Sequence, residues 1–110
     1  MEYSMIELDV LDRNTFGDRQ LRDEVLGLFR QQSLELMARL EATTSATDWK
    51  ISAHKLKGSA LGIGAQTVAQ LAAQVEQAFF SDNLSSRDAA LAPLRRAVEA
   101  TNREISGLLA

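Results

Sequence analysis

Apolar residues recur at helical spacing in four long stretches of this chain, and this pattern constrains the fold more than any other feature. Such spacing indicates amphipathic helices that each turn one face toward a common core. The four apolar stripes consist of Leu21, Val25, Phe29, Leu36 and Leu40, then Trp49, Leu56, Ala60 and Ile63, then Val68, Leu71, Ala72, Val75 and Phe79, and finally Leu91, Leu94, Val98, Ile105 and Leu108. Leu28 and Met37 lie at the edges of the first of these stripes.

Turn and capping residues separate the stripes. The predicted helices run over about residues 18–41, 48–62, 65–80 and 86–109, after a short one at about 7–16. Asp18 is a suitable N-cap for the first long helix, and Thr47 or Asp48 for the second. Gly17 can adopt the left-handed conformation that ends the short helix. Pro93 lacks an N–H group, so the last helix either kinks there or begins its regular part there.

Composition agrees with an all-helical fold. The chain has 110 residues, of which 45% are hydrophobic and 25% charged, as is ordinary for one folded domain. Only 5% of residues are aromatic, and Ala, Leu, Glu, Gln and Arg are abundant, which favours helix over sheet. Short connections favour antiparallel neighbours. We therefore expect a single all-α domain over residues 1–110, an antiparallel four-helix bundle with a short extra N-terminal helix, acting as a monomer.

Charge and residue usage argue against several classes of function. A net charge of -3 offers no broad basic surface for nucleic acid. Without cysteine, and with one histidine, the chain lacks thiolate ligands and multi-histidine metal clusters. Binding of a hard cation by carboxylates alone stays open, but no motif marks such a site, and we expect no bound metal. The N-terminal stretch "MEYSMIELDVLD" lacks the pattern of a signal peptide, and no apolar run is long enough to span a bilayer. We expect a cytoplasmic protein, or a domain of a larger one, without a membrane partner.

The only histidine, His54, lies in the stretch "SAHKLKGSALGIGA". At about 100° per residue, His54 is roughly 140° from the centre of the apolar stripe of its helix and should be exposed. Lys57 and Gly58, three and four positions later, share its face. Glycine costs a helix interior about 1 kcal/mol relative to alanine, so Gly58 allows either close helix packing or the approach of another molecule.

An exposed imidazole flanked by lysine and glycine suits phosphoryl acceptance better than hydrolysis. A neutral ring nitrogen can act as a nucleophile, a cation can offset phosphoryl charge, and a glycine leaves room for a partner. A hydrolase would need His54 to activate a nucleophile, but cysteine is absent and Ser59 lies away from the His54 face.

The stretch "HKLKGSALGIGA" resembles the His-x-Leu-Lys-Gly-Ser motif of histidine-containing phosphotransfer (HPt) domains, which act in multistep phosphorelays. The resemblance extends to "LFRQQSLELMARLEA", to "DW" and to the "GA...LA..VE.A" pattern. It implies a four-helix bundle with a short N-terminal helix. It also implies that His54 carries a phosphoryl group between aspartates of receiver domains.

The resemblance also implies roles for the neighbours of His54. Lys57 would be the adjacent cation, Gly58 the residue that admits the receiver, and Glu76 a hydrogen-bond partner of the imidazole. The receiver would supply the aspartate and the magnesium site, so no cofactor is expected on this chain. Response-regulator receiver domains are the implied partners, with a hybrid sensor histidine kinase as a further candidate.

We expect the partner to dock near His54, on apolar residues and one lysine. The patch would comprise Leu8, Leu11, Leu28, Ile51, Lys55 and Leu61. Ile51 and Leu61 fit either the core or the rim of a docking surface. An alternative function is a helical adaptor that binds a receiver or kinase without accepting phosphate, and a hydrolase using His54 as a base is a third.

Overall fold

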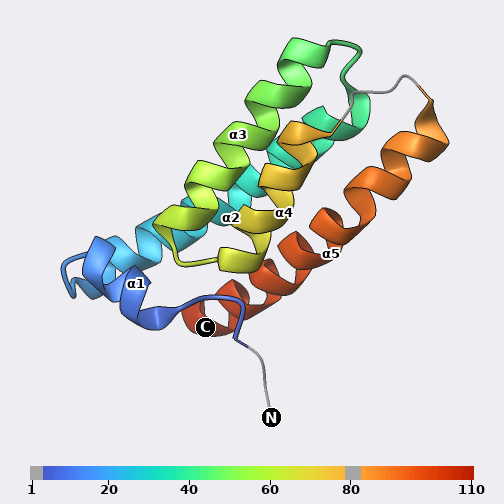
Figure 1. Ribbon diagram of the computed structural model, residues 1–110. Helices are drawn as coiled ribbons and strands as arrows, with labels where there is room; N and C mark the ends of the chain where they lie inside the picture. Colours follow the sequence, from blue (N-terminus) through green and yellow to red (C-terminus); the bar gives the residue numbers. More distant parts are fainter. Residues whose placement is uncertain (1–3, 79–82) are drawn as a thin grey trace.

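Helices make up most of the chain in the computed structural model, which describes residues 4–78 and 83–110 (Figure 1). In these ranges there are five helices and no strand, so the prediction of an all-α fold is confirmed. The helices are α1 (Leu8–Asn14), α2 (Arg19–Ala42), α3 (Ala46–Gly62), α4 (Gln66–Gln77) and α5 (Leu84–Leu109).

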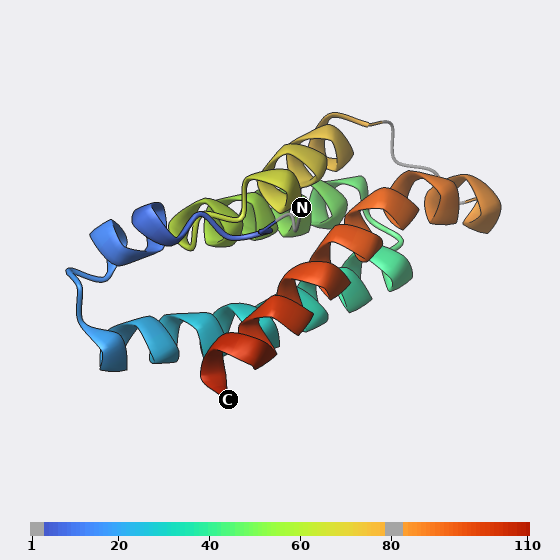
Figure 2. The ribbon, with the colours of Figure 1, turned by 90° about the horizontal axis from the view of Figure 1, so that it is seen from below.

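The four longer helices form an antiparallel bundle. α3 packs between α2 and α4, and α5 also contacts α2 and α4, so α3 and α5 lie diagonally opposite each other. Figure 2 shows α3 and α4 as one layer over α2 and α5. The short α1 contacts α3 at one end of the bundle. This arrangement leaves the outer faces of α3 and α4 side by side.

Large apolar side chains fill the core. Trp49 is 1% exposed, and its indole Nε1 donates to the carbonyl oxygen of Val75 at 2.8 Å, which ties α3 to α4. The predicted stripe of α2 is partly wrong. Leu26 and Met37 are buried, whereas Leu21, Val25 and Leu36 are only partly so. The buried face of α2 also includes a polar residue, Ser33, which an apolar pattern cannot reveal. Its Oγ accepts a hydrogen bond from Nδ2 of Asn102 on α5 at 3.0 Å.

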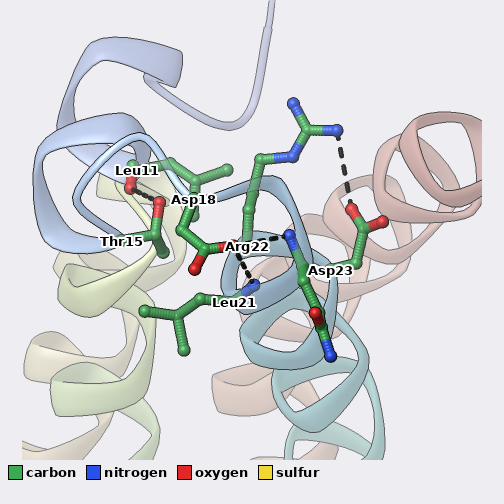
Figure 3. Close-up of polar contacts among 7 residues, drawn as sticks. Leu11, Thr15, Asp18, Leu21, Arg22 and Asp23 are labelled. Atoms are coloured by element: carbon green, nitrogen blue, oxygen red, sulfur yellow. Dashed lines mark hydrogen bonds and ion pairs between the residues drawn. The ribbon is translucent and has the colours of Figure 1, made fainter.

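Side-chain caps begin three of the helices. Asp18 is the N-cap of α2, as predicted, and its carboxylate accepts from the backbone N–H groups of Gln20 and Leu21 (Figure 3). The predicted cap of α3 at Thr47 or Asp48 is wrong. Ser45 takes this place, because its hydroxyl accepts from the Asp48 N–H at 3.2 Å, and both predicted residues lie inside the first turn.

α5 begins earlier than the proline suggested. Its N-cap is Asn83, whose side chain accepts from the N–H of Ser86 at 3.1 Å. Pro93 lies inside the helix, so the alternative in which the regular helix begins at Pro93 is wrong. α4 ends with Gln77, and the predicted continuation through Phe79 and Phe80 falls outside the described residues.

Two hydrogen bonds, one between backbone groups and one from a side chain, hold α1 against the end of α3. The N–H of Glu7 donates to the carbonyl oxygen of Gly64 at 2.9 Å, and Asn14 Nδ2 donates to that of Gly62 at 3.0 Å. Gly64 has φ +77°, and a Cβ atom there would lie 2.7 Å from the Glu7 carbonyl oxygen. Only glycine fits this contact without strain.

Candidate functional site

His54 lies on the outer face of α3, as its helical angle predicted. Its side chain is 66% exposed, while Trp49, Leu56 and Ala60 of the same helix are at most 1% exposed and face the core. The imidazole therefore occupies a surface that a partner can reach.

Glu76 reaches the imidazole from α4. Its Oε2 lies 3.1 Å from His54 Nδ1, and its side chain is 26% exposed. A carboxylate can only accept a hydrogen bond, so a neutral imidazole in this pair carries its proton on Nδ1. The lone pair then lies on Nε2, the nitrogen that does not contact Glu76. In that tautomer the contact with Glu76 orients the ring, and Nε2 is the unprotonated ring nitrogen.

Gly58 is exposed, one turn after His54 on the same face of α3. A Cβ atom added at Gly58 would meet no atom within 4 Å. Close packing against another helix of this chain, one of the two explanations for the glycine, is therefore wrong. Lys57 is partly buried beside it, and Lys55 is exposed.

A hollow between α2 and α3 opens beside Gly58. Residues of both helices line it: Gln32, Glu35, Leu36, Arg39, Lys55, Gly58 and Ser59. The hydroxyl of Ser59 donates to Gln32 Oε1 at 3.3 Å rather than to His54. Ser59, the serine next to Gly58 in the sequence, therefore forms no serine–histidine pair with His54.

The apolar residues proposed for docking are exposed with one exception. Leu8, Leu28, Ile51 and Leu61 are between 45% and 52% exposed, so Ile51 and Leu61 belong to the surface and not to the core. Leu11 is 0% exposed, and its place in the docking patch is wrong because α1 turns this side chain into the core.

Sequence reasoning missed two exposed residues. Phe16 is 86% exposed and has φ +56°, a conformation that the sequence pattern did not reveal. Lys50 is exposed and precedes His54 by four positions, one turn away on α3. Its spacing of four residues from His54 is the sequence feature that could have predicted this placement.

Fold and site together define a helical bundle that presents one carboxylate-paired histidine to solvent. The model of the Hpt domain family matches residues 24–109, so this chain belongs to the Hpt domain family. Proteins of this family are phosphocarriers that serve histidine phosphotransfer in phosphorelays and interact with receiver domains. Neither a curated protein nor a solved structure matches the chain. Within the described residues, no helix is long and apolar enough to cross a membrane.

Proposed function

We propose that this protein accepts a phosphoryl group on His54 Nε2 from the aspartyl phosphate of one receiver domain and donates it to the aspartate of another. The observation that carries the proposal is the exposed imidazole whose Nδ1 lies 3.1 Å from the carboxylate of Glu76. Such a contact holds the ring in one orientation, which lowers the entropic cost of reaching an in-line geometry.

The proposed step forms one bond and breaks another. The Nε2 lone pair forms the new N–P bond while the O–P bond of the aspartyl phosphate breaks, and the aspartate leaves as a carboxylate. Nδ1 keeps its proton, and the positive charge that develops on the ring is offset by Glu76. The reverse step returns the phosphoryl group to an aspartate, so the direction of flow depends on the partners.

Lys57 and Gly58 have complementary parts in this proposal. The ammonium group of Lys57 offsets the charge on the phosphoryl oxygens, as cations do in phosphoryl transfer generally. Because Gly58 has no side chain, it leaves space beside the imidazole. The receiver can then bring its aspartate and its bound magnesium ion close to Nε2. The domain acts in the cytoplasm as a monomer, with a hybrid sensor histidine kinase as a candidate source of one receiver.

Phosphoryl exchange with receivers tests the proposal directly. A panel of receiver domains from the same cell is phosphorylated with a small phosphodonor and magnesium, then mixed with this protein. We expect at least one receiver to transfer an acid-labile, base-stable label within seconds to minutes. Binding of receivers without any transfer would contradict the carrier and support the adaptor.

A Gly58→Ala variant tests the need for open space beside His54. Within the domain the new methyl group meets nothing within 4 Å, so the helix should gain up to about 1 kcal/mol of stability. In the complex it would displace the receiver, and we expect transfer to slow by about tenfold or more. Stopped-flow transfer rates and thermal melts measure the two effects.

Gly107→Ala is the matched control for this variant. Gly107 is also exposed and helical with open space around it, but it lies on α5, diagonally opposite α3. We expect unchanged transfer rates in the control. Equal rates for Gly58→Ala and the wild type would show that partner access does not explain the glycine.

A further inference from the structure

Three lysines surround His54 on α3, and the function proposed above uses only one of them for phosphoryl charge. Lys50 precedes the histidine by one turn, Lys55 follows it directly, and Lys57 follows by one turn. Across residues 4–78 and 83–110, no ion pair joins any of these lysines to a described residue. Their ammonium groups are therefore available to a ligand at His54.

The lysines lie on two different sides of the imidazole. At about 100° per residue, Lys50 and Lys57 are roughly 40° and 60° from His54 in one direction, and Lys55 about 100° in the other. Lys55 lines the hollow between α2 and α3, which places its side of α3 toward α2. Lys50 and Lys57 therefore share the side toward α4, from which Glu76 contacts Nδ1.

Side-chain direction brings both of these lysines toward the ring. Helical side chains lean toward the N-terminus, so the imidazole leans over the turn that contains Lys50, and Lys57 leans back over His54. Cβ atoms one turn apart are about 5–6 Å apart, within the span of a lysine side chain. Both ammonium groups can reach oxygens of a phosphoryl group on Nε2.

Charge balance favours the use of both Lys50 and Lys57. A phosphoryl group carries about -1.5 to -2 charge near pH 7, and the carboxylate of Glu76 already lies beside the ring. Lys57 alone would leave excess negative charge at the site. We propose that Lys50 is a second phosphoryl-binding residue, so that Lys50 and Lys57 hold the phosphoryl group of His54 between them. This inference rests on the proposed function, since it requires His54 to carry phosphate.

Phosphoramidate allows a test without any receiver. Nε2 of His54 forms its N–P bond as the P–N bond of zwitterionic phosphoramidate breaks, and ammonia leaves. The titration of the phosphohistidine resonance is then followed by phosphorus NMR at low salt. A cation beside the phosphoryl group favours the dianion and lowers the midpoint of this titration.

Removal of the Lys50 charge should move that midpoint upward. For Lys50→Gln we expect a rise of about 0.3–0.5 pH units, the size that Coulomb's law gives for a charge about 6 Å away in water. Lys50→Arg should restore the wild-type value. Lys55→Gln changes the net charge equally on the other side of the ring, and we expect less than half of the rise.

Two results would overturn the inference. One is an equal midpoint in Lys50→Gln and Lys55→Gln, which would mean that only net charge matters. The other is a wild-type protein that gives no phosphohistidine signal with phosphoramidate. Lys50→Gln could raise the titration midpoint although no receiver exchanges phosphate with the protein. In that case the proposed function would be wrong, while the assignment of Lys50 and Lys57 as phosphoryl-binding residues would hold.

Discussion

His54→Gln is expected to abolish the uptake of phosphate from every phosphorylated receiver. Glutamine keeps a polar side chain at a position that is 66% exposed, but its amide has no nucleophilic ring nitrogen. His54 is also the only histidine in the sequence, so no second imidazole could take its place. The measurement is the label that remains on this protein after it is mixed with a phosphorylated receiver.

The stability of the His54→Gln variant separates loss of chemistry from loss of fold. Exposed substitutions usually change stability by no more than about 0.5 kcal/mol, so we expect a thermal melt close to that of the wild type. Titration calorimetry with an unphosphorylated receiver should show that binding persists. A variant that still acquires acid-labile label would place the phosphoryl group on another residue and contradict the site.

Local patterns in the sequence were sufficient to predict where the helices lie along the chain and that His54 faces outward. Asp18 could be recognised as a cap because its carboxylate acts on the N–H groups of the next residues along the chain. The outward position of His54 follows from the angle between it and Trp49, Leu56 and Ala60 on one helix. Both are properties of a single segment.

Contacts between segments set the features that the sequence pattern missed. Ser33 lies on the buried face of α2, where Asn102 of α5 donates a hydrogen bond to its hydroxyl, and an apolar pattern cannot include such a residue. Leu8 and Leu11 are the same residue type in the same short helix, yet the packing of α1 buries Leu11 and leaves Leu8 exposed. The contact of Glu76 with His54 was expected from family resemblance, and its 3.1 Å geometry depends on the pairing of α3 with α4.

Gly64 has the largest expected effect on stability. A side chain at φ +77° costs about 1–2 kcal/mol, and the Cβ atom would lie 2.7 Å from a backbone oxygen that cannot move independently of α1. We expect Gly64→Ala to lower the free energy of unfolding by about 2–4 kcal/mol. Chemical denaturation measures this directly.

Gly62→Ala is the matched control, because Gly62 is two residues away, exposed, and without an atom within 4 Å of an added Cβ. Its stability should equal or slightly exceed that of the wild type. Gly64→Ala should also break the hydrogen bond from Glu7, and hydrogen exchange at the Glu7 N–H would then rise. Since His54 and Glu76 are held by α3 and α4, phosphorylation of His54 by phosphoramidate should persist in the folded fraction. Loss of stability in both variants alike would mean that the end of α3, rather than its contact with α1, limits the fold.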